Sequence, residues 1–176
     1  QALASTFADP AALGTVFASL AGSDPAAVDL FLIAASASDA LTSQLNTLVQ
    51  ANPELAGAMI ERLSSSPAAL ETVVDLAAAS PNALVALSSI ASVDDSPLGL
   101  GAAILVSVVQ SSPEALANFT VAVESSPYML ANVQSIAENV DGFTSVLSAV
   151  GVDTADFSPP VLVVNVPVVE QPEVVP

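Results

Sequence analysis

Apolar residues recur along the chain at helical spacing, in repeated units that begin with a similar short sequence motif. The motif reads SSPAAL at 65–70, ASPNAL at 79–84 and SSPEAL at 111–116. After each proline, apolar residues follow three, six or seven, and nine or ten positions later, which places them on one face of a helix. Each unit therefore predicts one amphipathic helix of about 10 to 13 residues. The residues three positions after a proline are Leu13, Val28, Leu70, Leu84, Leu100, Leu116 and Leu130.

A small polar residue precedes the proline that opens a unit, and this pair predicts where each helix begins. The polar side chain at the N-cap accepts a hydrogen bond from a backbone N–H that has no partner in the helix. Proline suits the first helical position because its missing N–H would have had no partner there. Two further units, SDAL at 38–41 and VDGF at 140–143, begin without proline. The predicted caps before proline are Asp9, Asp24, Asn52, Ser66, Ser80, Ser96, Ser112 and Ser126.

The spacing of these units predicts the fold class. Consecutive prolines lie 14 to 16 residues apart, except for one gap of 28 that contains the unit at 38–41. Such short helices are marginal alone, so they must stack. If successive helices are antiparallel, two units form a hairpin of about 29 residues, and stacked hairpins form an α-solenoid. We expect an all-α domain over residues 1–156, a repeat of about ten short antiparallel helices in an α-solenoid or superhelical stack. The alternative is a compact helical bundle, which obeys the same local rules.

Residues 157–176 depart from this pattern and predict an extended, Val/Pro-rich C-terminal tail. Its five prolines forbid a helix of any length, and 161–166 is apolar on both faces, like a buried strand. No other segment offers a strand to pair with it. The tail is a linker without fixed structure, a segment that folds back on its own helices, or one that docks on a neighbouring copy. In the third case the assembly residues are Val161, Leu162, Val163, Val164, Val166, Val168 and Val169.

Composition excludes several classes of partner. The chain has 176 residues, of which 53% are hydrophobic, and its net charge is −17 with a single Arg and no Lys. Nucleic-acid binding needs Lys or Arg to neutralise phosphates, so we expect none. The longest apolar run, 98–109, has 12 residues, short of the about 20 that span a bilayer, so we expect no membrane span.

The residues that usually carry catalysis are missing, so we expect no enzyme, no catalytic residues and no cofactor. The chain has no His, Cys or Lys. Its tight acidic pairs, Asp94–Asp95 and Asp153 with Asp156, stand at predicted turns and are interpreted as caps, with weak divalent-cation binding as the alternative. No dedicated metal site is expected.

Three smaller features have a structural and a functional interpretation. GLGAAIL at 99–105 is interpreted as a close helix–helix contact rather than a phosphate loop, because no strand precedes it and no Lys follows. Arg62 is expected to pair with a nearby acid across a turn or with an acid of another copy. Asn118 opens an NFT glycosylation sequon in the middle of a predicted helix, and its use is left open.

These observations favour a non-enzymatic structural subunit of an extracellular filament, sheath or surface layer. Such a subunit would assemble into a homo-oligomer or polymer by stacking and by docking of its C-terminal tail. The alternative is an α-solenoid module that binds a protein or peptide. An acidic, Lys-poor composition and a chain beginning at Gln1, as a processed end would, favour an extracellular or cell-surface location.

Overall fold

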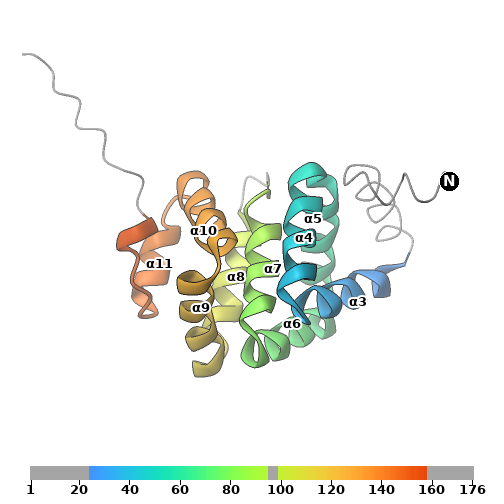
Figure 1. The fold of residues 1–176 in the computed structure, drawn as a ribbon, viewed down its shortest axis with the longest axis horizontal. Coiled ribbons are helices and arrows are strands. Elements are labelled where there is room, and N and C mark those ends of the chain that lie inside the picture. The colour runs from blue at the N-terminus through green and yellow to red at the C-terminus, as the bar shows by residue number, and fades with distance from the viewer. Residues whose placement is uncertain (1–23, 95–98, 158–176) are drawn as a thin grey trace, which may run out of the picture.

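The computed structural model describes residues 24–94 and 99–157, and these fold into α-helices without any strand. The stack runs along the long axis of the molecule from α3 to α11 (Figure 1). The prediction of an all-α helical repeat is confirmed. The helices are α3 (Pro25–Ser36), α4 (Asp39–Ala51), α5 (Pro53–Ser65), α6 (Pro67–Ala79), α7 (Pro81–Ala91), α8 (Leu100–Gln110), α9 (Pro113–Ser125), α10 (Pro127–Asn139) and α11 (Phe143–Ala149), followed by a 3-10 helix, η1 (Ala155–Phe157).

Most of the predicted helix starts are confirmed at the level of hydrogen bonds. In each confirmed case the cap side chain accepts from a backbone N–H two or three residues ahead, at 3.0 to 3.3 Å; these caps are Asp24, Ser66, Ser80, Ser112 and Ser126. Ser38 caps the unit without proline in the same way. Asn52 is the exception, because its Nδ2 donates to the Leu48 carbonyl at 3.2 Å and so caps the end of α4, not the start of α5. Asp9 and Ser96 lie outside the described residues.

Glycine replaces the polar cap at two other helix starts. Gly99 precedes α8 with φ of 57°, and Gly142 precedes α11 with φ of 81°. This left-handed backbone strains residues that carry a Cβ. The helix expected to begin at Pro97 is therefore observed from Leu100, while residues 95–98 lie outside the described part of the chain.

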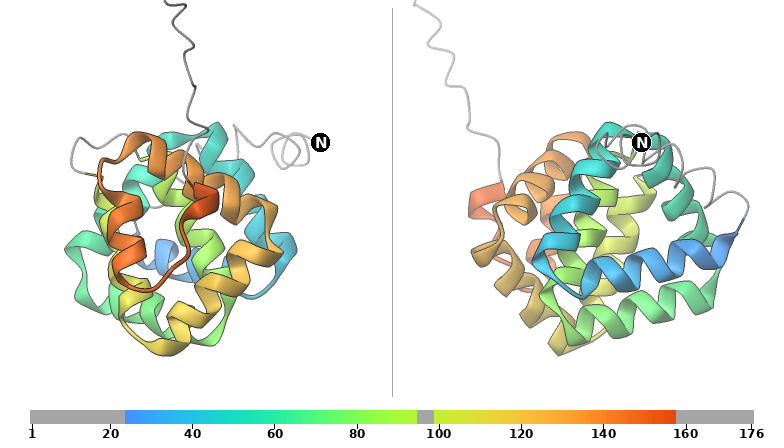
Figure 2. Two further views of the ribbon diagram at one scale, coloured as in Figure 1. Left: turned by 90° about the vertical axis from the view of Figure 1, so that its left-hand side faces the viewer. Right: turned by 45° about the vertical axis from the view of Figure 1, so that its right-hand side comes forward.

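The stack repeats after three helices, not after the two-helix hairpin that the sequence analysis expected. Each helix packs against the one three places further on, from α3 with α6 through to α8 with α11. Figure 2 shows α3 lying alongside α6. Hydrogen bonds between turns join residues 40 to 44 apart, which is the length of three units. The hairpin length was wrong because turn geometry alone does not decide which helices share a buried face.

A buried polar cluster joins three successive turns of this stack. Asn132 on α10 donates from Nδ2 to Ser88 Oγ at 3.2 Å and to Ser89 Oγ at 3.1 Å, both on α7. The same amide lies 3.2 Å from Asn46 Oδ1 on α4. Both serine hydroxyls in turn donate to the Val85 carbonyl at 2.8 Å. Because buried polar groups are costly unless paired, this cluster favours one register of α4, α7 and α10 over others.

Helix α7 is the centre of the molecule. It contacts α3, α4, α5, α6, α8, α9 and α10, and residues 83–91 are buried without interruption. Apart from Ser88 and Ser89, this buried stretch is apolar on all sides, as is typical of a central helix.

The apolar stripe that faces the core begins one residue earlier than the sequence analysis expected. Among the described residues three positions after proline, Val28, Ala56 and Leu84 are buried, whereas Leu70, Leu116 and Leu130 are half-buried and Leu100 is exposed. The buried residue of the first turn lies two positions after proline, where a small side chain often lets neighbouring helices approach. These residues are Leu55, Ala69, Ala83, Ala115 and Met129.

Gly101 confirms the close contact expected within GLGAAIL. A Cβ built at Gly101 would lie 2.8 Å from Ala91 Cα and 3.1 Å from Ile60 Cδ1. The missing side chain therefore lets α8 pack directly against the end of α7 and against α5. Gly57, in the middle of α5, has no atom within 4 Å of such a Cβ.

Candidate functional site

The predicted assembly residues of the tail, 161–169, lie outside the described residues. The description ends at Phe157, which is buried in η1 against α10. Val152 is buried in the segment that leads to it. The last described residue is therefore held against α10.

An apolar hollow lies near this end of the stack, between α8 and the start of α11. Its volume is about 350 Å³. Val146, on its rim, is 42% exposed, and Val140 packs against Gly99, where a Cβ would lie 3.1 Å from Val140 Cγ1. Its lining is Gly99, Ala102, Ala103, Val106, Ser107, Gln110, Val140, Asp141, Gly142, Phe143 and Val146. The hollow offers surface for an apolar segment, with a few polar groups at its margin.

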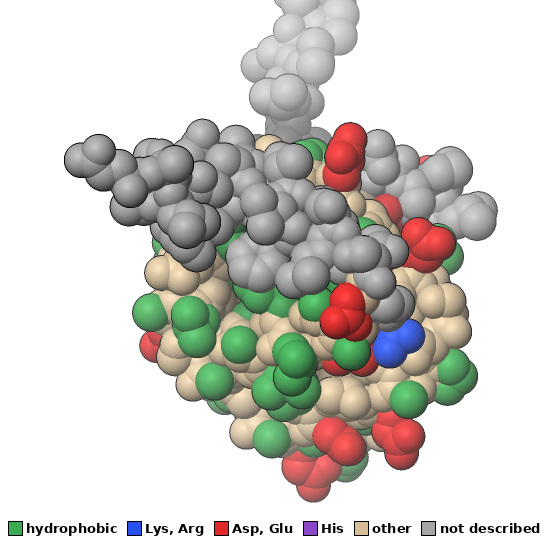
Figure 3. Space-filling view, turned by 90° about the vertical axis from the view of Figure 1, so that its right-hand side faces the viewer, with side chains coloured by type: hydrophobic (Ala, Val, Ile, Leu, Met, Phe, Trp, Pro, Cys, Tyr) green, Lys and Arg blue, Asp and Glu red, His purple; other side chains and the backbone are tan. Residues whose placement is uncertain are grey.

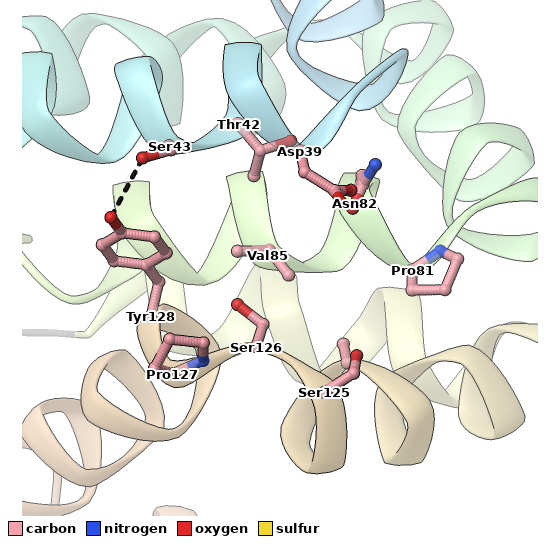
Figure 4. A pocket seen from close by; sticks show the side chains of 11 residues that line it. Asp39, Thr42, Ser43, Pro81, Asn82, Val85, Ser125, Ser126, Pro127 and Tyr128 are labelled. Carbon is pink, nitrogen blue, oxygen red and sulfur yellow. Dashed lines mark hydrogen bonds between the residues drawn. The ribbon is translucent and has the colours of Figure 1, made fainter.

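A polar hollow of about 240 Å³ lies on another side, between α4, the first turn of α7, and the α9–α10 junction. Figure 4 shows Tyr128 at one edge, with a hydrogen bond of 3.0 Å between its Oη and Ser43 Oγ. Tyr128 is the only tyrosine of the chain and is 41% exposed. Asp39 and Asn82 line the opposite part of the same hollow. Sequence reasoning missed this site, and the only signal for it was a tyrosine directly after a helix-starting proline.

The polar hollow presents groups that can form hydrogen bonds with a ligand. It presents hydroxyls, one amide and one carboxylate, and no His, Cys or Lys exists in the chain to act as base or nucleophile. Within the described residues, no three acidic side chains gather closely enough to hold a metal ion. A neutral, hydrogen-bonding ligand or peptide group fits this lining best.

Arg62 pairs inside its own chain, with an acid of a different helix. Its Nη2 lies 2.9 Å from Asp29 Oδ2 and its Nε donates to Oδ1 at 3.3 Å, which joins α5 to α3. These hydrogen bonds raise the pKa of the Arg62 guanidinium, although desolvation lowers it. The expectation of a partner across a turn or on another copy was wrong, because the acid comes from a helix two places earlier in the stack.

The acidic pairs behave as caps where their side chains are described. Asp94 Oδ2 accepts from the Gly101 backbone N–H at 2.8 Å, and Asp153 Oδ1 accepts from that of Ala155 at 3.0 Å. Each carboxylate thus serves a helix start. The side chains of Asp95 and Asp156 lie outside the described part.

Asn118 holds two helices together. Its Nδ2 donates to the carbonyls of Ala77 and Ala78 at 2.9 and 3.0 Å, where α6 ends. Asn118 lies in the middle of α9 and is half-buried. Attachment of a glycan at this nitrogen would remove one of its two donor hydrogens and place the sugar against the end of α6, so the structure argues against use of the sequon in the folded chain.

Large apolar side chains are exposed at both ends of the described stack. Leu30 on α3 is 66% exposed, and Ile33 and Leu41 are also exposed at this end, while Val146 is exposed on α11. Figure 3 looks onto the α3 end, where apolar side chains lie mainly over the centre and left of the visible surface, and the single basic residue and most acidic side chains lie toward its right and lower edge.

Among the described helices, none alone has the length and apolar composition that crossing a bilayer requires. Taken together α8 and α9 would pass that test, but they meet at a bend of 119°.

Comparison of this chain with protein-family models, with curated proteins and with solved structures finds no match. The proposals below therefore depend on the geometry and the sequence.

Proposed function

We propose that this protein is a non-enzymatic structural subunit of an extracellular filament, sheath or surface layer. Copies assemble by stacking of their helical repeats and by docking of the C-terminal tail on a neighbour. The observation that carries the proposal is the exposure of apolar side chains on the first and the last α-helix that the structure describes, Leu30 on α3 and Val146 on α11; Val121 on α9 is exposed as well. Repeat domains that remain monomeric normally end in helices with a polar outer face.

The two ends of the stack are different surfaces, and this favours open assembly. A contact between unlike surfaces leaves one of each kind free, so that it forms an open filament unless the rotation closes a ring. The absence of His, Cys and Lys from the whole sequence supports a role without catalysis. The apolar tail at 161–169 supplies a second means of contact.

The size of the full chain in solution, with and without its tail, tests this proposal. Light scattering and negative-stain microscopy should show polymers of the full chain at physiological salt. Deletion of residues 158–176 should leave a folded monomer, with far-ultraviolet dichroism dominated by helix. The double substitution Val163→Asp and Val164→Asp should have the same effect, because an unpaired buried carboxylate is costly. A full chain that stays monomeric at every concentration and salt would contradict the proposal.

A second candidate function, an α-solenoid module that binds a protein or peptide, is favoured by the hollow beside Tyr128. Tyrosines that are partly exposed next to a hollow are common anchors of binding sites. A displayed peptide library selected on the wild-type chain and on Tyr128→Ala tests it. Sequences that bind the wild type and lose binding to the variant would support this candidate, and equal selection on both would dismiss it.

A further inference from the structure

The apolar hollow exists because the last turn of the stack is shorter than the others. Helix α8 has 11 residues and extends for about 16 Å, whereas its partner three places on, α11, has seven and extends for about 10 Å. Earlier helices in the stack have partners of 11 to 13 residues. Part of the flank of α8 is therefore left beside α11 without a helix to cover it.

The chain itself carries a segment of matching chemistry. Residues 161–169 contain seven apolar side chains, all Val or Leu, and no charge. An extended chain places alternate side chains on opposite faces, so that every second valine can enter a narrow apolar hollow. The volume of about 350 Å³ is within the range of sites that bury small ligands or a few side chains.

The point at which the tail leaves the stack favours a neighbouring copy over its own. Phe157 is fixed on α10, and two prolines, Pro159 and Pro160, follow almost at once. A residue before proline prefers extended backbone, so the sequence predicts a straight exit rather than a tight return to α8. The 19 residues from 158 to 176 reach at most about 63–68 Å, which is enough to arrive at another copy.

We propose that residues 161–169 of one copy bind in the hollow between α8 and α11 of the next copy. This inference rests on the proposed function, because it names the surface on which the assembly tail docks. Ser107 and Gln110, which line the hollow, offer polar side chains that could bond to the backbone of the bound segment.

The absence of cysteine from the sequence makes disulfide cross-linking a direct test. One chain carries Ala103→Cys in the hollow; a second carries Val163→Cys or Val164→Cys in the tail. Oxidation of the mixture should give a disulfide-linked dimer of the two different chains. One tail position should react several-fold more than the other, since alternate residues face opposite ways. The matched control is Thr120→Cys, which is exposed on α9 away from the hollow and should react little.

A single chain that carries both cysteines separates docking between copies from docking within one copy. If the double variant closes its own disulfide as a monomer, and the mixed single variants give no dimer, the tail folds back and the inference is overturned. Equal reaction at Ala103→Cys and at the control Thr120→Cys overturns it as well.

A charge placed in the hollow provides the second test, with size as its readout. Val146→Glu should weaken assembly about tenfold or more, because the tail would bury a carboxylate without a partner. Val121→Glu is the matched control: Val121 is 47% exposed on α9, outside the hollow, and its substitution should leave assembly unchanged. Dichroism should show both variants folded.

The outcomes separate this inference from the proposed function. If the tail deletion abolishes assembly while Val146→Glu and Val121→Glu both assemble normally, the tail docks elsewhere and only the inference fails. If the full chain does not assemble under any condition, the proposed function fails first.

Discussion

At the scale of single residues, two glycines in helices show how local packing decides the effect of one methyl group. Gly57 has open space where a Cβ would lie, whereas a Cβ at Gly101 would lie 2.8 Å from Ala91 Cα. The same substitution should therefore change stability in opposite directions at the two positions.

Gly57→Ala should raise the free energy of unfolding by about 0.5–1 kcal/mol, because alanine loses less backbone entropy in a helix. Gly101→Ala should lower it by about 1–3 kcal/mol, since the added Cβ must push α8 away from α7. Urea denaturation of the two variants, followed by dichroism, measures both changes. A Gly101→Ala variant as stable as Gly57→Ala would mean that α8 does not pack on Ala91 as closely as described.

The ion pair between Arg62 and Asp29 shows what residue identity alone leaves undecided. Sequence reasoning identified Arg62 as the single cation but could not choose among 18 acids. The choice depends on which helices face each other, and Asp29 is 33 residues away. Similarly, the hydrogen bonds from Asn132 to Ser88 and Ser89 join residues 43 and 44 positions apart, and no local sequence signal indicates them.

At the scale of elements, the helix starts are the part of the fold that the sequence predicts best. A polar cap followed by proline acts within three or four residues, so it needs no tertiary information. The capped helices are α3, α6, α7, α9 and α10. Each begins at its proline, and the side chain of each N-cap residue accepts a hydrogen bond from a backbone N–H of the first turn.

Which residues of each helix face the core was harder to predict from the sequence. The leucines three positions after proline were expected in the core, but Leu116 is half-buried whereas the smaller Ala115 is fully buried. Hydrophobicity alone favours the larger side chain. The observed register depends on how closely neighbouring helices approach, and only the assembled fold determines that distance.

The cap of α9 gives a prediction at this scale. Ser112→Ala should lower the free energy of unfolding by about 1 kcal/mol, because the backbone N–H of Ala115 loses its acceptor at 3.0 Å. Ser145→Ala, at an exposed position within α11, is the control and should be neutral or slightly stabilising. Thermal or chemical denaturation distinguishes them. Equal effects at the two serines would show that the cap contributes nothing measurable.

At the scale of the whole molecule, charge opposes the assembly that the apolar ends favour. Each copy carries a net charge of −17, and its single Arg is already paired within the chain. Copies therefore repel one another without basic groups to offset the repulsion. Screening by salt should decide whether apolar contacts prevail.

Assembly of the full chain should strengthen as ionic strength rises from about 0.01 M to about 1 M, over which the Debye length falls from about 30 Å to about 3 Å. Sedimentation velocity at a fixed protein concentration measures the change. The tail deletion serves as control and should assemble less than the full chain at every ionic strength, because it retains only the stacking contacts. Strongest assembly in low salt with a chelator present would contradict the role assigned to the acidic surface.

The three-helix turn has a consequence for how such a chain can change in length. Removing one unit of 14 to 16 residues between α7 and α10 would rotate every later helix by a third of a turn, and Asn132 would no longer lie over Ser88 and Ser89. Removing three consecutive units, 44 residues in the spacing of Asn132 and Ser88, would keep each remaining helix in phase with its neighbours. The fold should therefore accept insertion or deletion of three consecutive helices, which form one turn of the stack, but not of a single helix.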